Sequence, residues 1–266
     1  MERLDMYLYQ KGYFDSREKA KRMIMAGNVF INGIMKDKPG EKIKEITSVE
    51  IKHRALYVGR GGQKLEKAFQ VFNFSVKDRI AMDIGASTGG FTDCMLHSGA
   101  KKVYAIDVGY GQLDWRLRQD PRVICFERKN FRNMCFEEIG EKIQRFTMDV
   151  SFISIIKLLD NVKMFLVAMG EGVVLIKPQF EAGKDKVGKN GVIRDPKVHK
   201  NVLMNTLYKI EEKGFRIIDL DFSPIKGNKG NIEYLCHLCA EDGVVMGINK
   251  MEEMIDIVVK NANDQL

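Results

Sequence analysis

Four charged residues in this sequence could together take a proton from a hydroxyl group: Lys64, Asp149, Lys177 and Glu233. The last three each stand at one end of a short apolar run, where an expected strand begins or ends. A lysine that is desolvated beside other charges can be neutral near neutral pH and can act as a general base. Two carboxylates would keep such a pocket close to neutral and would orient both amines. We therefore expect these four side chains to meet at one edge of a sheet.

A glycine-rich turn after the first expected strand, Ile80 to Ile84, is the candidate cofactor site. In an α/β sheet this turn is where a nucleotide-like ligand binds, and glycines allow the close approach of the backbone. Asp107 closes the next strand, 24 residues after Asp83, and could hold ribose hydroxyls. The spacing of the glycines departs from both the dinucleotide and the phosphate-loop patterns, so S-adenosylmethionine (SAM), which has no phosphate, fits better. The predicted contacts are Asp83, Gly85, Ala86, Ser87, Thr88, Gly89, Gly90, Phe91, Asp107 and Val108.

Short apolar runs that alternate with helical patterns must position these residues. Such alternation predicts a largely parallel sheet that is covered on both faces. The last two runs are joined by a loop too short for a helical crossover, so the final strand should be antiparallel. This α/β arrangement resembles the class I SAM-dependent methyltransferase fold. The expected strands are Ile80 to Ile84, Val103 to Asp107, Val123 to Phe126, Phe146 to Val150, Gly172 to Lys177, Phe215 to Leu220 and Ile232 to Leu238.

The N-terminal region differs from this pattern in charge and in periodicity. The chain has a net charge of +7, and residues 1–60 hold 13 Lys and Arg against 8 Asp and Glu, which gives +5. Two short helices precede a hairpin whose turn is Asn32-Gly33. We therefore expect a small α+β module that binds a polyanion. Its candidate phosphate contacts, with one from the following linker, are Arg3, Arg17, Lys19, Lys21, Arg22 and Arg60.

Two resemblances make these expectations more specific. The segment DSREKAKRMIMAGNVFING resembles the αL RNA-binding domain that is named after a small-subunit ribosomal protein. The motifs RGGQKLEKAF, MDIGASTGGFTDCML, MDVSFIS, VLIKPQFE and NIEYL resemble the TlyA family of ribosomal RNA 2′-O-methyltransferases, whose methyltransferase domain is FtsJ-like. The implied domains are residues 1–58 for RNA binding, 59–63 as a glycine-rich linker and 64–266 for methyl transfer.

The second resemblance also implies a reaction and roles for residues. It implies SAM as the cofactor, cytidine riboses of ribosomal RNA within ribosomal subunits as the substrate, and no metal. Lys64, Asp149, Lys177 and Glu233 would form the family's catalytic tetrad, with Lys177 as the proton acceptor. This agrees with the chemistry, because a ribose hydroxyl is a poor nucleophile that must lose its proton as it attacks a sulfonium methyl.

Other functions fit the sequence less well. An amino-directed methyltransferase would show Pro-Pro and an aromatic residue after the fourth strand, and none of the five prolines precedes a cysteine that could attack a pyrimidine. A membrane-active haemolysin and a catalytically inert RNA-binding assembly factor remain alternatives. The sequence shows neither a secretory signal nor a spanning segment, and its five cysteines fit reduced thiols, so we expect a cytoplasmic protein. The segment 180–195, with Lys184, Lys186, Lys189 and Arg194, is expected to form a lid over RNA.

Overall fold

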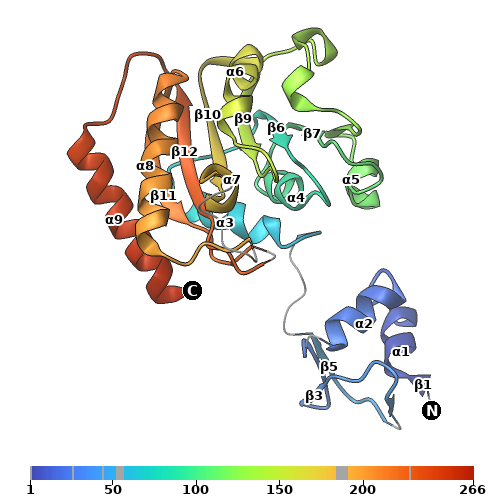
Figure 1. The fold of residues 1–266 in the computed structure, drawn as a ribbon. Coiled ribbons are helices and arrows are strands. Elements are labelled where there is room, and N and C mark those ends of the chain that lie inside the picture. Colours follow the sequence, from blue (N-terminus) through green and yellow to red (C-terminus); the bar gives the residue numbers. More distant parts are fainter. Residues whose placement is uncertain (1, 26, 44, 52–56, 184–190, 228) are drawn as a thin grey trace. The chain divides into compact units, whose positions relative to one another are not determined.

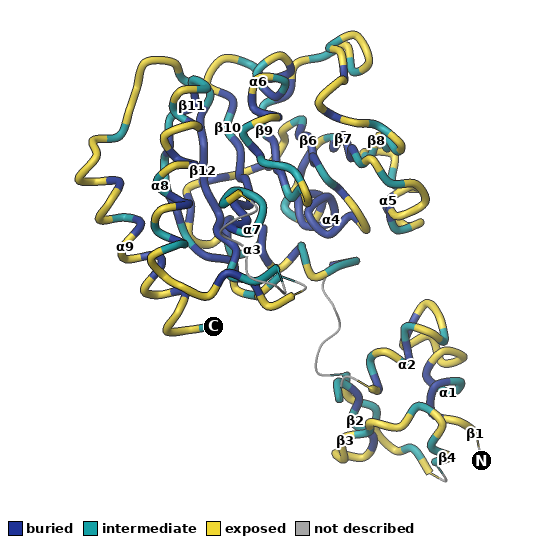
Figure 2. Tube along the Cα trace, in the orientation of Figure 1, coloured by how far each residue is buried: buried dark blue, intermediate teal, exposed yellow. Residues whose placement is uncertain are grey.

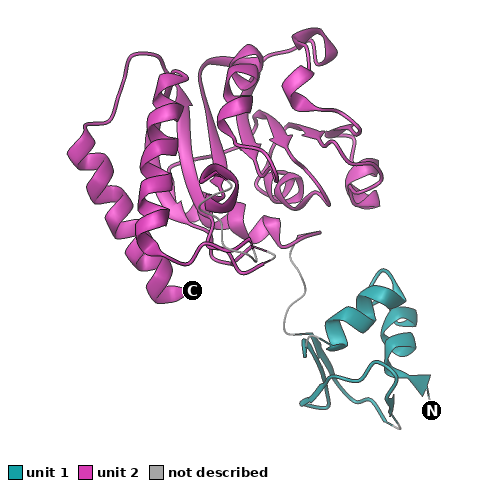
Figure 3. Ribbon diagram, in the orientation of Figure 1, with its two compact units in different colours: residues 1–56 teal, residues 57–266 magenta. Residues whose placement is uncertain are grey.

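The chain is divided into two compact units, Met1–Leu56 and Tyr57–Leu266, in a computed structural model (Figure 3). The structure describes all residues except 1, 26, 44, 52–56, 184–190 and 228. The units are considered separately below. The expected linker 59–63 belongs to the second unit, because Gly61 and Gly62 already form the first turn of helix α3 (Gly61–Val71). The structure thus divides the chain between Leu56 and Tyr57, before the predicted linker begins.

The first unit contains the two short helices and the hairpin that the sequence predicts. Helices α1 (Leu4–Gln10) and α2 (Arg17–Met25) share a buried core with a three-stranded antiparallel sheet of order β3 (Ile34–Lys36), β2 (Val29–Ile31) and β5 (Val49–Ile51). Strand β1 (Glu2–Arg3) pairs with β4 (Lys42–Ile43). At the turn between β2 and β3, Asn32 and Gly33 have φ values of 51° and 77°. Both left-handed positions are those that the Asn-Gly turn favours.

The described part of the second unit contains a seven-stranded sheet in the order β11-β12-β10-β9-β6-β7-β8 (Figure 1). The five strands from β10 to β8 pair in parallel, whereas β12 is antiparallel to both of its neighbours. The predicted reversal of the final strand is thus confirmed. The strands are β6 (Ile80–Ile84), β7 (Lys102–Ile106), β8 (Val123–Phe126), β9 (Ile143–Met148), β10 (Leu166–Ile176), β11 (Phe215–Phe222) and β12 (Tyr234–Ala240).

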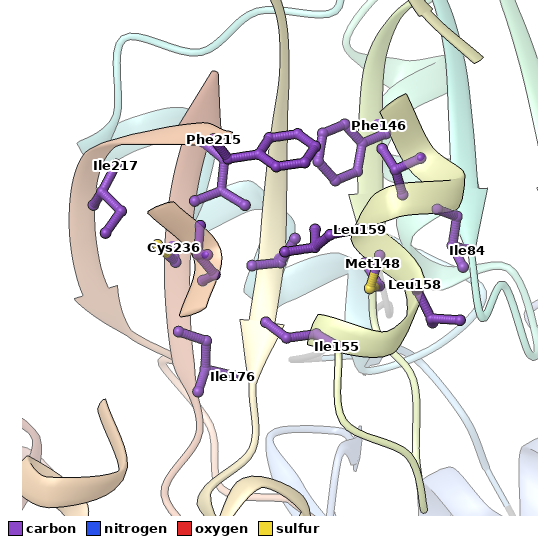
Figure 4. Close-up of a cluster of buried hydrophobic side chains, with 14 of the residues drawn as sticks. Ile84, Phe146, Met148, Ile155, Leu158, Leu159, Ile176, Phe215, Ile217 and Cys236 are labelled. Carbon is purple, nitrogen blue, oxygen red and sulfur yellow. The ribbon is translucent and has the colours of Figure 1, made fainter. Parts of the chain in front are cut away.

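Helices cover both faces of this sheet, and each face has its own hydrophobic core (Figure 2). One core joins the sheet to α6 (Ile156–Phe165), α8 (Pro196–Glu212) and α9 (Ile248–Gln265), and Figure 4 shows part of it around Phe146, Leu159 and Phe215. The other core joins the sheet to α3, α4 (Gly90–His97) and α5 (Trp115–Gln119). Strands covered on both faces are apolar throughout, which is why the sequence shows continuous apolar runs.

This architecture brings the carboxyl ends of the parallel strands to one edge of the sheet. Asp107, Asp149 and Lys177 directly follow β7, β9 and β10. Glu233 directly precedes β12, whose reversed direction places its start at the same edge, since Tyr234 pairs with Ile176. Each of these residues lies one position outside its strand. The edge is the expected position for a ligand in an open α/β sheet.

Candidate active site

The four charged side chains that the sequence singles out form one connected cluster. The ammonium nitrogen Nζ of Lys177 lies 2.6 Å from Asp149 Oδ1. Lys64 Nζ lies 2.7 Å from Glu233 Oε2 and 3.4 Å from Asp149 Oδ2. Asp149 therefore bridges the two lysines, and Glu233 completes a chain of alternating charge. Residues up to 169 positions apart in the chain meet here.

Burial makes these electrostatic contacts strong. The side chains of Lys64, Lys177 and Glu233 are 10%, 9% and 4% exposed, whereas Asp149 is 19% exposed. Burial disfavours the charge of Lys64, but the attraction of Asp149 and Glu233 outweighs it and raises the pKa of that lysine above its ordinary value. Lys64 is thus held as an ammonium ion between two carboxylates. Its place in the cluster is that of a fixed positive charge.

The glycine-rich turn lies next to this cluster. Gly85 has φ +85°, and a Cβ there would come within 2.5 Å of the carbonyl oxygen of Asp149. The Asp149 backbone N–H also donates to the carbonyl of Ile84 at 3.0 Å. Ser87 and Thr88 are exposed at the tip of the turn. The cofactor candidate and the catalytic candidate therefore share a backbone contact that only glycine permits.

The predicted cofactor residues differ in burial: Asp83 is buried below the glycine-rich turn, whereas Asp107 and Val108 lie at the surface. Asp83 is fully buried beneath it and accepts hydrogen bonds from the hydroxyls of Thr92 at 2.6 Å and Thr147 at 3.0 Å. Burial raises the pKa of Asp83 to about 6, against these two hydrogen bonds. Asp107, by contrast, is partly exposed at the surface of the site, and the adjacent Val108 is 70% exposed. A direct ligand contact, as predicted from sequence, suits Asp107 and Val108 but does not suit the enclosed carboxyl of Asp83.

Asp107 organises the backbone around it. Its Oδ2 accepts from the Ser87 N–H at 2.8 Å, and its Oδ1 accepts from the Gly109 N–H at 2.7 Å. The carboxylate therefore ties the glycine-rich turn to the loop after β7. Each carboxylate oxygen can accept a second hydrogen bond, so capacity remains for ligand hydroxyls.

Three residues beside Lys177 were missed by the sequence reasoning. Ser151 Oγ accepts a hydrogen bond from Lys177 Nζ at 3.0 Å. Phe152 is 91% exposed with a left-handed φ of 65°, and its ring centroid lies 5.1 Å from that of Phe180. Nothing in the periodicity marks these positions, because Ser151 and Phe152 lie in a loop and Phe180 lies in the short helix α7 (Pro178–Glu181). An exposed aromatic ring in a strained conformation beside a charged cluster is typical of a binding surface.

Basic residues that were predicted to bind RNA occur in both units. Five lie in the first unit, where Arg3 and Arg17 each donate to the buried carboxylate of Asp5 at 3.0 Å. Arg22 is exposed on α2. Lys19 forms an ion pair with Asp15, which precedes α2, and Lys21 forms one with Glu18 on the same helix. Arg60 is exposed and precedes α3 in the second unit, whereas the other five belong to the first unit.

We expect the substitution Asp5→Asn to destabilise the first unit at neutral pH, because Arg3 and Arg17 lose their shared partner. Burial raises the pKa of Asp5, but hydrogen bonds from the two guanidinium groups outweigh burial and lower that pKa. The stabilisation is therefore present above the ordinary aspartate pKa of about 4 and is lost as the pH falls through the lowered value. Hydrogen exchange of α1 and α2 in the full chain measures this. Equal exchange in both proteins at neutral pH would contradict the assignment.

The cysteines, possible metal ligands, possible membrane spans and the expected lid lie outside this cluster or show no site among the described residues. All five cysteines are free, and no cluster of potential metal ligands occurs among the residues that the structure describes. No described helix is both long and apolar enough to span a membrane. Arg194 is exposed, whereas Lys184, Lys186 and Lys189, the other basic residues of the expected lid, lie outside the described residues.

The fold and the site define a methyltransferase of the SAM-dependent fold class that carries a separate RNA-binding domain. Residues 57–239 match the FtsJ-like methyltransferase model, and residues 2–46 match the S4 domain model. The chain therefore belongs to the FtsJ-like methyltransferase family, as the TlyA resemblance predicted.

Relatives with known names cover almost the whole chain. Hemolysin A of Brachyspira hyodysenteriae is 48% identical over 88% of this chain and 98% of its own length. The 16S/23S rRNA (cytidine-2′-O)-methyltransferase TlyA of Mycobacterium tuberculosis is 37% identical over 95% of each chain. The solved structure of a Streptococcus thermophilus protein that carries a hemolysin name is 46% identical, with a TM-score of 0.78 over 99% of this chain and 96% of that one. Proteins similar to this one thus carry either the name hemolysin, which is a historical label, or the name of an rRNA methyltransferase.

Proposed function

We propose that this protein methylates the 2′-hydroxyl of cytidine riboses in ribosomal RNA, with SAM as the methyl donor. The observation that carries the proposal is the connected cluster of Lys64, Asp149, Lys177 and Glu233 beside the glycine-rich turn. The similarity to TlyA of Mycobacterium tuberculosis supports the substrate. A ribosomal substrate would also place the protein in the cytoplasm.

The residues around the turn fit SAM. Its ribose hydroxyls would bind the free acceptor positions of Asp107, and its adenine would cover the exposed side chain of Val108. The carboxylates of Asp107 and Asp149 at this edge suit a cation that has no phosphate. Asp83 would support the turn from beneath through its hydrogen bonds to Thr92 and Thr147. When bound, SAM supplies an electrophilic methyl group.

The chain's own residues would activate the hydroxyl. Lys64 remains positively charged between its two carboxylates, so it is a poor proton acceptor. The proton of the ribose 2′-hydroxyl would therefore pass to Lys177 as the ribose oxygen becomes a nucleophile. Asp149 orients the amine of Lys177 through the 2.6 Å contact, and Glu233 holds Lys64 in place. The burial of these groups excludes water and strengthens each interaction.

We expect Asp107→Ala to weaken SAM binding by about tenfold or more, because hydrogen bonds to a charged group are lost together with the link between the two loops. The reaction rate at saturating SAM should change much less. Calorimetric titration with SAM measures the first effect, and single-turnover methylation measures the second. The matched control is Asp120→Ala, an aspartate that pairs with Arg122 on the same unit. Unchanged SAM affinity in Asp107→Ala would remove this residue from the cofactor site.

The proposed function is tested by mapping the modified nucleotide. Each purified ribosomal subunit is incubated with the protein and SAM, and its RNA is then digested with alkali, which cannot cleave next to a 2′-O-methylated ribose. We expect new alkali-resistant dinucleotides that contain cytidine. Methyl incorporation that leaves every linkage sensitive to alkali would show a base methyltransferase. No incorporation into either subunit would contradict the proposal.

A further inference from the structure

The hydroxyl group of Ser151 contacts the amine that the proposed reaction uses. Ser151 follows β9 by three residues, and Lys177 follows β10 directly, so two neighbouring strand ends bring them together. The distance from Lys177 Nζ to Ser151 Oγ is 3.0 Å, within the normal range of a hydrogen bond. The amine donates and the serine oxygen accepts, since Lys177 carries only donors when charged. A neutral amine keeps two N–H donors, so the same contact can persist after the amine has lost a proton.

Among the described residues, Lys177 Nζ has two hydrogen-bonding partners, and the ring centroid of Phe180 lies 5.8 Å from it. Nζ has three positions besides its bond to carbon, and Asp149 Oδ1 at 2.6 Å and Ser151 Oγ at 3.0 Å occupy two of them. A neutral amine has two N–H bonds and one lone pair. If both N–H bonds are held by Asp149 and Ser151, the lone pair must point in the third direction. An amine with only one acceptor could rotate and direct its lone pair elsewhere.

We propose that Ser151 is a positioning residue that, together with Asp149, fixes the lone pair of Lys177 toward the substrate hydroxyl. The proposal rests on the proposed function of Lys177 as proton acceptor. Ser151 itself does not receive the proton and need not touch the RNA. Its side chain is exposed, so its truncation leaves no buried cavity. An effect of Ser151→Ala on the reaction would therefore reflect the lost hydrogen bond.

The expected pH dependence distinguishes positioning from a structural role. A hydrogen bond to an ammonium ion is stronger than one to a neutral amine, so loss of the acceptor disfavours the charged form. The other charged groups around this amine are Asp149, Lys64 and Glu233, and none of them is altered in Ser151→Ala. The acidic limb of the pH–rate profile should therefore move to lower pH while the plateau rate falls. A loosened loop would instead lower the rate equally at every pH.

The first test measures single-turnover methylation of ribosomal subunits at saturating SAM between about pH 6 and pH 9. For Ser151→Ala we expect a plateau rate lowered roughly tenfold through lost alignment, with SAM affinity unchanged. Ser151→Thr keeps the hydroxyl and should restore both the rate and the position of the limb. The matched control is Ser154→Ala in the same loop, whose hydroxyl accepts from the Ile156 N–H. A wild-type profile for Ser151→Ala, or an equal and pH-independent loss in both alanine variants, would overturn the proposal.

The second test needs neither RNA nor cofactor, so it separates this proposal from the proposed function. Reductive methylation with formaldehyde modifies neutral amines, and mass spectrometry reports the extent of modification at Lys177 as a function of pH. In Ser151→Ala the labelling curve of this lysine should move to lower pH, whereas the curve of the exposed Lys101 should not move. An unmoved curve at Lys177 would overturn the positioning role even if the wild-type enzyme methylates ribose. A moved curve without any ribose methylation would instead contradict the proposed function alone.

Discussion

Lys177→Ala should abolish methyl transfer while leaving SAM affinity almost unchanged. The lysine contacts Asp149 and Ser151 and makes no described contact with the glycine-rich turn, so its expected role is on the hydroxyl and not on the cofactor. Loss of a general base costs about 10² to 10⁴ in rate, and lost alignment can add to this. Single-turnover methylation at saturating SAM measures the rate, and calorimetry measures the affinity.

The matched control for this prediction is Lys67→Ala. Lys67 lies on α3, one turn after Lys64, and pairs with Asp221 at 3.0 Å and not with a residue of the tetrad. This variant removes a partly buried lysine and its ion pair, so it reports any general effect on folding. Wild-type single-turnover rates in Lys177→Ala would show that another group accepts the proton, and Lys64 would then have to be examined despite its two carboxylate partners.

The second large effect is expected from removal of the N-terminal unit. The fragment Tyr57–Leu266 should keep its SAM affinity but bind ribosomal subunits at least tenfold more weakly at moderate salt, because several phosphate contacts are lost. The removed residues 1–56 hold 12 Lys and Arg against 8 Asp and Glu, which is +4 of the net charge of +7. The salt dependence of RNA binding should also be less steep for the fragment, since fewer counterions are released. Filter binding at several salt concentrations measures both quantities.

The starting residue of this fragment matters. Tyr57 is 8% exposed and lies under Gly62, where a Cβ would come within 2.3 Å of its ring. The Val58 N–H donates to Asp93 Oδ2 at 2.8 Å. A fragment that begins at Gly59 lacks both contacts and should melt at a lower temperature than the fragment that begins at Tyr57. RNA affinity of Tyr57–Leu266 equal to that of the full chain would contradict the targeting role of the first unit.

The sheet and the tetrad were predictable because strands and their ends leave strong signals. Continuous apolar runs indicate strands that are covered on both faces, and a charged residue directly after such a run has to lie at the sheet edge. Asp149 and Lys177 are therefore found one residue after their strands. The reversed final strand followed from the short preceding loop, and with it the position of Glu233. These inferences use chain geometry alone.

Features that depend on loop conformation were not predictable. The contact between Ser151 and Lys177 and the left-handed backbone of Phe152 arise in a loop without periodicity. The burial of Asp83 was also missed, because a carboxylate beside a glycine-rich turn has the same sequence whether it faces the ligand or two threonine hydroxyls. The glycines at 61 and 62 were interpreted as a linker, whereas they begin a helix and make room for Tyr57. Tertiary contacts decided each of these cases.

The position of β12 has a consequence for how the enzyme comes into being during synthesis. This strand lies between β10 and β11, and the residue before it supplies the carboxylate that is paired with Lys64, 169 positions earlier. Loop closure over such a separation is slow, and a growing chain cannot achieve it before the later segment has left the ribosome. An incomplete chain can therefore form its RNA-binding domain early but cannot complete the cluster of Lys64, Asp149, Lys177 and Glu233. A chain that is still being synthesised therefore carries an incomplete methyltransferase domain until its last strand has left the ribosome.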